Sequence, residues 1–360
     1  MAIQSNVGKM LAAVWHGPQD IRLEEVELPK VIPGSLLLRV KVCAICGSDL
    51  RIFNEGNPRI TKPTIVGHEV SGEVVEVGEG VNQFVIGDRV SVGADIPCGV
   101  CVHCLSGRGN CCDINYAIGY QFNGGFAEYM LLDPLVVSHG PVHKFNKDLS
   151  WNLAALAEPL ACCINGYERA LFDDNSKDED IVIFGAGPIG LMLLLLGIQK
   201  YLAKRIIMIE PSKERRMLAE SLGAAYLIDP NVDDPVSIVM GITNGQGVRA
   251  VFTANSVVET HEQAIAMVGT RGVVNLFGGL PKNAPPITML SNQLHYKEAY
   301  LTGSHGSTPE QHGKALSLIE SNQVDLAPLI SKSFTLENII DGYNMARSSS
   351  FAKVIIHPND

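Results

Sequence analysis

The stretch IVIFGAGPIGLMLLLLGI, residues 181–198, decides the fold. It carries no charged side chain over 18 residues, a length close to that of a membrane-spanning helix. Its centre, however, is the segment GAGPIG, with three glycines and a proline. Such residues favour a tight turn and break a continuous helix. We therefore predict a strand at 181–184, a turn, and a helix that covers 191–200, with no membrane span.

The chain that follows repeats this alternation. Apolar runs at 206–209, 250–252 and 273–277 predict buried strands, and 212–222 predicts an amphipathic helix between two of them. Apolar strands separated by helices are typical of a parallel sheet that is covered on both faces. The region before Trp151 differs, because short Val/Ile-rich runs there alternate with Gly and Pro. That region predicts a small β-barrel or sandwich.

Length and composition exclude several classes of protein. The 360 residues suggest about two domains at ~150 residues each, and 46% hydrophobic residues exclude a disordered chain. The net charge is −10 and no Lys/Arg cluster offsets it, so we expect no nucleic-acid partner. Nine cysteines, an odd number, argue against a secreted disulfide framework. Because the N-terminus also lacks the pattern of a signal peptide, we expect a cytoplasmic protein.

Four cysteines predict a metal site. Cys98, Cys101, Cys104 and Cys112 have the spacing C-x2-C-x2-C-x7-C in a Gly-containing loop. Four thiolates at this spacing can converge on one tetrahedral ion, which predicts structural zinc. An iron–sulfur cluster and loop cysteines without a joint role are the alternatives, and the neighbouring Cys111 competes with Cys112 as the fourth ligand.

A second, open metal site is predicted from residues that lie apart in the sequence. Cys46 stands in CGSD, His68 and Glu69 stand in GHE, and Glu158 interrupts an apolar run. A thiolate, an imidazole and a carboxylate, with a water, would form a catalytic zinc site. A structural role for His68 and a redox pair of Cys43 with Cys46 are the alternatives.

The glycine turn predicts a nucleotide site. In GAGPIG, Gly185 permits the turn, Gly187 lets a pyrophosphate approach the backbone, and Gly190 lets the helix pack on the strand. Glu210 ends the next strand and is placed to accept hydrogen bonds from ribose hydroxyls, which favours NAD over NADP. The nearby Arg215 and Arg216 weaken this inference, because arginine also accommodates a 2′-phosphate. A glycine turn that binds nothing is the alternative.

Taken in order, these motifs resemble the zinc-dependent medium-chain dehydrogenase/reductase superfamily, in its polyol and threonine dehydrogenase branch. The resemblance rests on CGSD, GHE, GDRV at 87–90, the four-cysteine loop, AEPL at 157–160 and GAGPIG, and it covers essentially the whole chain. It implies an α/β protein with a GroES-like β-rich catalytic domain (1–156), a Rossmann NAD-binding domain (157–294) and a return segment that completes the catalytic domain (295–360).

The resemblance also implies roles for individual residues. Two positions match ligands of the catalytic zinc, Cys46 and His68, and two match carboxylates that ligate the ion or hold its water, Glu69 and Glu158. Ser48 matches the first member of a proton relay, and Asp49 matches a residue that orients the ligand histidine. The four-cysteine loop matches the structural zinc lobe, which makes two zinc ions per chain. The residues implied in NAD binding are Gly185, Gly187, Pro188, Ile189, Gly190, Glu210, Arg215, Phe277 and Gly278.

The sequence departs from the family at one position. Five residues after the zinc cysteine, many members carry a histidine that ends the proton relay, whereas this chain has Arg51. Arginine does not exchange a proton at neutral pH. Arg51, Asn57 and Arg59 lie in a loop that the resemblance places near the substrate, where we expect them to contact an anionic or hydroxyl-rich molecule. Solvent-facing arginines are the alternative.

We therefore expect a zinc-dependent, NAD-linked enzyme that interconverts a secondary alcohol and a ketone, with a polyol, a sugar alcohol or its phosphate as substrate. The alternatives are a threonine 3-dehydrogenase, a dehydrogenase of simple secondary alcohols, and a zinc- and nucleotide-binding protein without activity. The resemblance implies a homotetramer, with a homodimer as the alternative.

Overall fold

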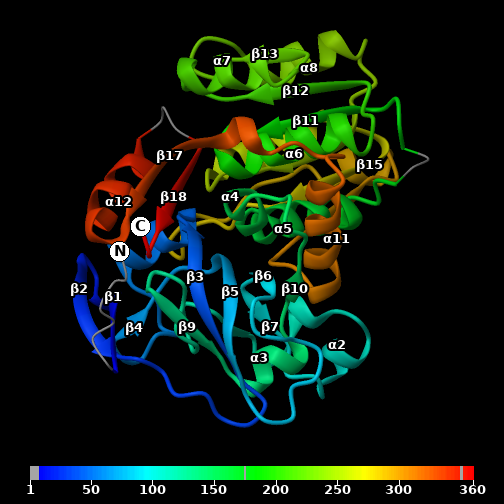
Figure 1. Cartoon of the computed structure of the whole chain (residues 1–360). Helices are drawn as coiled ribbons and strands as arrows, with labels where there is room; N and C mark the ends of the chain where they lie inside the picture. Colours follow the sequence, from blue (N-terminus) through cyan, green and yellow to red (C-terminus); the bar gives the residue numbers. More distant parts are fainter. Residues whose placement is uncertain (1–7, 174–175, 349–351) are drawn as a thin grey trace. The chain divides into compact units, whose positions relative to one another are not determined.

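A computed structural model describes residues 8–173, 176–348 and 352–360 (Figure 1). The chain divides into two compact units. The first unit comprises Met1–Ala161, Gly306–Asn322 and Leu326–Asp360, and the second comprises Cys162–His305 and Gln323–Asp325. The segments that flank the second unit in sequence therefore belong to the same unit. The divisions expected from the sequence lie after residues 156 and 294.

The second unit is built on a six-stranded sheet in which every pairing is parallel. Its strand order is β13-β12-β11-β14-β15-β16, the doubly wound order in which the first strand lies at the centre. This confirms the predicted parallel sheet. The strands are β11 (Asp180–Phe184), β12 (Arg205–Ile209), β13 (Tyr226–Ile228), β14 (Val248–Thr253), β15 (Val268–Leu276) and β16 (Tyr300–Gly303).

One helix precedes the strands of this sheet, and the others connect them. They are the greater part of α5 (Ala157–Arg169), then α6 (Pro188–Gln199), α7 (Lys213–Ser221), α8 (Pro235–Ile242), α9 (Val258–Met267) and the short α10 (Asn292–His295). In α6 the residues from Gly190 to Gly197 are all buried, which explains why this helix is apolar on every side. The uncharged stretch at 181–198 is therefore a buried strand, a turn and a buried helix. Among the described residues, no helix has both the length and the apolar character needed to cross a membrane.

The first unit is mostly β-structure, as predicted. Its main sheet has the order β10-β6-β5-β3-β18-β17, with β9 also paired to β3, and a smaller sheet has the order β2-β1-β4. The strands are β1 (Lys9–Gly17), β2 (Asp20–Glu27), β3 (Leu36–Ala44), β4 (Thr64–Ile65), β5 (Glu69–Val77), β6 (Arg89–Val92), β7 (Asp95–Ile96), β8 (Tyr116–Ala117), β9 (Tyr129–Leu132), β10 (Val142–Lys144), β17 (Ile330–Thr335) and β18 (Lys353–His357).

Most helices of the first unit are short, and α11 in the C-terminal segment is the longest of those that lie wholly within it. They are α1 (Gly47–Glu55), α2 (Val102–Leu105), α3 (Pro134–His139), α4 (Trp151–Ala155), α11 (Pro309–Glu320) and α12 (Ile339–Arg347), with single 3-10 turns at Gly109–Cys111, Ala327–Leu329 and Leu336–Asn338. The core consists of inward-facing side chains of β1, β3, β5 and β6 together with residues of α12.

One strand pairing positions the candidate site. The last strand, β18, runs antiparallel to β3, with Ile355 opposite Ala44. Strand β5 lies on the other side of β3, with Glu69 opposite Ala44. The end of β3, immediately before Cys46, is therefore flanked by the first residues of β5 and by the C-terminal strand.

Candidate active site

Cys46 is held by the start of a helix. It is the N-cap of α1 with an extended backbone (φ −99°, ψ 156°), and its N–H group donates to Asp49 Oδ2 at 2.9 Å. This hydrogen bond satisfies a backbone donor that the helix itself leaves without a partner. The buried Asp49 thereby sets the direction in which α1 presents the Cys46 thiol.

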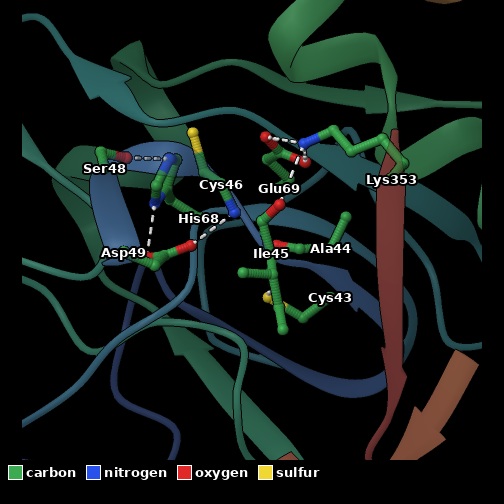
Figure 2. A network of polar contacts seen from close by, with 9 residues as sticks. All are labelled: Cys43, Ala44, Ile45, Cys46, Ser48, Asp49, His68, Glu69 and Lys353. Carbon is green, nitrogen blue, oxygen red and sulfur yellow. Dashed lines mark hydrogen bonds and ion pairs between the residues drawn. The ribbon is translucent and has the colours of Figure 1, made fainter. Parts of the chain in front are cut away.

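His68 is held by the same aspartate. Its Nδ1 lies 3.3 Å from Asp49 Oδ1, and its Nε2 lies 3.2 Å from the Ser48 hydroxyl (Figure 2). A proton on Nδ1, facing the carboxylate, leaves the Nε2 lone pair for a metal. The preceding Gly67 has φ +91°, and a Cβ there would lie 2.7 Å from Cys43 Sγ. Only glycine therefore fits the turn that delivers His68.

Glu69 faces a cation that was not expected from the motifs. Both oxygens of its carboxylate contact Lys353 Nζ, which also donates to the Ile45 carbonyl at 3.2 Å (Figure 2). Both side chains are buried. Burial acts to lower the pKa of Lys353, but the charges of Glu69, Cys46 and Glu158 and the hydrogen bond to Glu69 together outweigh it and raise that pKa. A lysine within the apolar strand AKVII was the available signal, since a buried lysine needs a partner.

The three side chains form a metal-binding set. Cys46, His68 and Glu69 each offer a ligand atom, and these atoms lie within 4.8 Å of one another. Burial acts to lower the pKa of His68, but Asp49 and Cys46 outweigh it and raise the pKa well above its usual value. This anionic surrounding suits a divalent cation, and sulfur, nitrogen and carboxylate donors match zinc.

Glu158 is not part of this three-residue set among the described residues. It is buried in the first turn of α5. Burial raises the pKa of Glu158 to about 8, His68 opposes the shift, and the charges of Glu69 and Asp95 add to it. Glu158 is thus a further buried carboxyl group, besides Asp49 and Glu69, within the electrostatic reach of His68.

The four predicted loop cysteines also come together. Ligand atoms of Cys98, Cys101, Cys104 and Cys112 lie within 4.8 Å of one another, whereas Cys111 is exposed and outside this set. Backbone N–H groups point at the sulfurs, for example from Cys101 to Cys98 Sγ at 3.4 Å. Hydrogen bonds from the backbone N–H groups of Asp113 and Cys104 lower the pKa of the Cys101 thiol to about 6. Four converging sulfurs fit a closed structural zinc site.

The glycine turn in the second unit joins β11 to α6. Gly185 has φ +94°, and a Cβ on Gly190 would lie 1.8 Å from the Gly185 carbonyl oxygen. A Cβ on Gly187, by contrast, would meet no atom within 4 Å. Gly187 is the N-cap of α6 and Pro188 follows at its first turn. The open space at Gly187 beside a helix N-terminus fits a phosphate group.

Glu210 lies against this turn. It is buried after β12, and its carboxylate accepts hydrogen bonds from the N–H of Ala186 at 2.7 Å and of Ser212 at 2.9 Å. Arg216 is engaged elsewhere, because it forms an ion pair with Asp229 at 2.8 Å and donates to the Glu210 carbonyl. Arg215 is half-buried in α7.

The Phe277–Gly278 pair follows β15, near the residues after β14. The Gly278 N–H group donates to the Thr253 carbonyl at 2.7 Å, and a Cβ on Gly278 would lie 2.0 Å from the Asn255 carbonyl oxygen. Only glycine therefore permits this close approach of two backbone segments at the carboxyl ends of the parallel strands.

Comparison with known proteins agrees with both units. The family of alcohol dehydrogenase GroES-like domains matches residues 32–141, and the family of zinc-binding dehydrogenases matches residues 188–321. An L-threonine 3-dehydrogenase of Thermococcus kodakarensis is 34% identical over 94% of this chain and 94% of its own length. The chain belongs to the zinc-dependent medium-chain dehydrogenase/reductase superfamily. It is an oxidoreductase that acts on CH–OH groups.

Solved structures place the dehydrogenase in the same group. The 2R,3R-butanediol dehydrogenase from Bacillus subtilis has a TM-score of 0.87 and 32% identity, over 97% of this chain and 100% of that chain. A zinc-binding dehydrogenase from Sinorhizobium meliloti 1021, bound to NADP, has a TM-score of 0.88 and 29% identity, over 97% of this chain and 99% of that chain. These relatives span the full length of the dehydrogenase, so the GroES-like and Rossmann-type fold is shared throughout.

The three residues that were expected near the substrate have different surroundings in the dehydrogenase. Arg51 is exposed on α1. Asn57 has a local structural role, because its Oδ1 accepts a hydrogen bond from the Arg59 N–H group at 2.9 Å. Arg59 is half-buried and contacts the loop that follows the structural metal site. Their roles toward a substrate remain predictions.

Proposed function

We propose that this dehydrogenase oxidises a secondary alcohol reversibly to a ketone, with NAD as the hydride acceptor and zinc as the metal. The observation that carries the proposal is the convergence of Cys46, His68 and Glu69 within 4.8 Å in a unit that also holds a closed four-cysteine site. One closed site and one site with three protein ligands correspond to structural and catalytic zinc. The proposal therefore includes two zinc ions per chain.

The residues around the catalytic site have distinct tasks. Cys46 and His68 hold the metal, and Glu69 or Glu158 provides the carboxylate that ligates it or holds its water. Zinc, when bound, acts as a Lewis acid that lowers the pKa of the substrate hydroxyl group. Asp49 orients His68, and the Ser48 hydroxyl, 3.2 Å from His68 Nε2, is placed to accept the proton of the substrate. Arg51 does not carry that proton onward, so another route to bulk water is needed.

The second unit binds the nicotinamide cofactor in this proposal. The open face of Gly187 and the N-terminus of α6 take the pyrophosphate, with Pro188 and Ile189 in the first turn. Glu210 is held by two backbone N–H groups, which leaves its remaining lone pairs for the ribose hydroxyls. Its charge would repel a 2′-phosphate, and Arg216 is already paired with Asp229. Both features support NAD over NADP. In this proposal Arg215 lies beside the adenine, and Phe277–Gly278 lies beside the nicotinamide.

A polyol, a sugar alcohol or its phosphate is the proposed substrate, and L-threonine is the second candidate. The butanediol dehydrogenase at 32% identity supports a diol-like substrate. The threonine dehydrogenases at 31–34% identity support the amino acid equally. Each of these molecules has a secondary hydroxyl group next to another polar substituent.

A substrate screen tests the proposal. The purified, zinc-loaded enzyme is assayed for NADH formation with polyols, their phosphates, L-threonine and 2,3-butanediol at matched concentrations, with NADP in parallel. NADH formation from one of these alcohols, and two zinc ions per chain by elemental analysis, are the expected results. A preference for NADP would contradict the role of Glu210, and a single zinc ion without any turnover would contradict the proposal as a whole.

Oligomeric state and location form the last part of the proposal. We infer a homotetramer in the cytoplasm from the branch of the superfamily that the motifs resemble, with a homodimer as the alternative. Light scattering after size-exclusion chromatography distinguishes the two assemblies.

A further inference from the structure

Arg59 stands on a turn whose shape is set by its neighbours. After α1 ends, Gly56 adopts φ +75° and donates its N–H group to the Ile52 carbonyl. The Asn57 side chain then accepts the Arg59 N–H group at 2.9 Å, and the Asn57 carbonyl accepts the Ile60 N–H group at 3.0 Å. The backbone of Arg59 is therefore fixed relative to α1, the helix that begins at the metal-binding Cys46.

Within the described ranges, the groups that hold the guanidinium group of Arg59 are neutral. Its Nη2 donates to the Asn115 carbonyl and, at 3.4 Å, to Gln121 Oε1, and its central carbon lies 4.7 Å from the centre of the Tyr120 ring. Gln121 Oε1 is itself fixed by the Ala117 N–H group at 3.0 Å. Among the described residues, no carboxylate forms an ion pair with Arg59, so its positive charge is not neutralised within this part of the chain.

Tyr120 places this cation beside the metal-binding residues. Gly119, with φ +77°, packs so closely on Gly67 that a Cβ would lie 3.3 Å from the Gly67 nitrogen, and Gly67 immediately precedes His68. Burial raises the pKa of Tyr120, and the charges of His68 and Asp49 also act on its hydroxyl group. Tyr120 therefore contacts Arg59 and is also within electrostatic reach of the metal-binding residues.

The negative charges around the metal site favour a cation that can bind an anionic substrate. Asp49 is a buried acidic residue near His68, and the buried Glu69 carboxylate is already paired with Lys353. An anionic substrate would be repelled by such carboxylates unless another positive charge met it. Arginine binds phosphate and carboxylate through a planar fork of N–H donors. In Arg59, Nε and Nη1 make no hydrogen bond to the described residues.

We propose that Arg59 determines the specificity of the dehydrogenase by binding an anionic group of the substrate, a phosphate or a carboxylate. The proposal rests on the proposed function, which supplies the alcohol that reacts at the metal. It names the substrate class more narrowly: an alcohol with a negatively charged substituent, held between the metal and the Arg59–Tyr120 pair.

Matched substrates test this proposal. Sorbitol and sorbitol 6-phosphate differ by a phosphate, and L-threonine and its methyl ester differ by a carboxylate. The kcat/KM of each is measured for the wild type, Arg59→Met, Arg59→Lys and Lys62→Met. Lys62 is an exposed cation on the same loop and serves as the control for net charge.

For one of the two pairs, we expect Arg59→Met to lower the kcat/KM of the charged member by about tenfold or more. The kcat/KM of the neutral member of that pair should fall by less than about threefold. Arg59→Lys should restore part of the loss, and Lys62→Met should behave as the wild type. The pair that shows the effect identifies the anion as phosphate or carboxylate. Equal losses for the charged and neutral members would assign Arg59 a structural role and overturn the proposal, as would a wild type that prefers the uncharged member of both pairs.

A binding measurement separates this proposal from the proposed function. Calorimetric titration of the zinc-loaded enzyme with sorbitol 6-phosphate and with L-threonine needs no turnover. If the wild type formed no NADH, the proposed function would fail, and weaker binding of either compound by Arg59→Met than by Lys62→Met would still support the anion site. Equal binding by the two variants would overturn it.

Discussion

Glu69 and Lys353 form a buried ion pair between the first residue of β5 and the first residue of β18. Because Glu69 is also one of the three residues that can bind the catalytic metal, its carboxylate has two alternative partners, a cation of the protein and a metal ion. Strand β3 lies between β5 and β18, so this pair joins β5 to the C-terminal strand across the end of the strand that leads to Cys46.

We predict that Lys353→Met destabilises the enzyme, because it leaves the Glu69 carboxylate buried without its partner. Breaking one side of a buried pair typically lowers the free energy of unfolding by roughly 3–5 kcal/mol. Urea denaturation of the zinc-loaded wild type and variant measures the effect. The double variant Glu69→Gln/Lys353→Met should recover part of the loss, and a Lys353→Met enzyme as stable as the wild type would contradict the prediction.

The four-cysteine site permits a test with neighbouring residues. Cys112→Ser should remove one zinc ion per chain and lower the melting temperature, since a structural zinc contributes directly to folding. Cys111→Ser is the control, because Cys111 is exposed and outside the set of four sulfurs. Elemental analysis and thermal denaturation measure both effects. A loss of zinc in the Cys111 variant instead would reassign the fourth ligand.

Two alanine substitutions in the glycine turn should have different consequences. Gly190→Ala places a methyl group 1.8 Å from the Gly185 carbonyl oxygen, so α6 must move and the second unit should lose stability, by more than about 1 kcal/mol. Gly187→Ala meets no protein atom within 4 Å and should fold normally, but its methyl group occupies the space assigned to the pyrophosphate. We expect weaker NADH binding by fluorescence titration with an unchanged melting temperature. Tight NADH binding by Gly187→Ala would place the pyrophosphate elsewhere.

A buried histidine that stacks on a half-buried one predicts sensitivity to acid. The rings of His143 and His312 stack at 5.3 Å, and His312 Nε2 lies 3.3 Å from the Ser91 hydroxyl group. Burial lowers the pKa of His312 to about 3 from its usual 6.5, and the charge of His143 acts in the same direction. Because the folded-state pKa is depressed, the stabilisation is fully present above pH 6.5 and is lost as the pH falls below it.

His312→Phe should therefore flatten the dependence of stability on pH. Between pH 7 and pH 5, we expect the wild type to lose about 2 kcal/mol more of its unfolding free energy than the variant, since each unit below the unfolded pKa costs about 1.4 kcal/mol. Urea denaturation at the two pH values measures this difference. His295→Gln, at an exposed histidine of the second unit, is the control. Parallel losses in wild type and His312→Phe would exclude His312 as the source.

Local patterns predicted most of the elements and several site residues. The strand expected at 206–209 is β12 at Arg205–Ile209, and the helix expected at 191–200 is α6 at Pro188–Gln199. The spacing of Cys98, Cys101, Cys104 and Cys112 predicted their convergence, because all four lie within one short loop. In such cases the steric and bonding constraints act between residues that are close in sequence.

The sequence by itself determined which residue types are available: the glycines without which α6 could not pack against the Gly185 carbonyl, and the sulfur, imidazole and carboxylate donors for zinc. Only the tertiary structure decided that Glu69 faces Lys353 and that Arg59 stacks on Tyr120. The physical reason is that these contacts depend on the register of strands and loops from distant parts of the chain. Backbone hydrogen bonding between β3 and β18 sets one such register, and no local spacing encodes it.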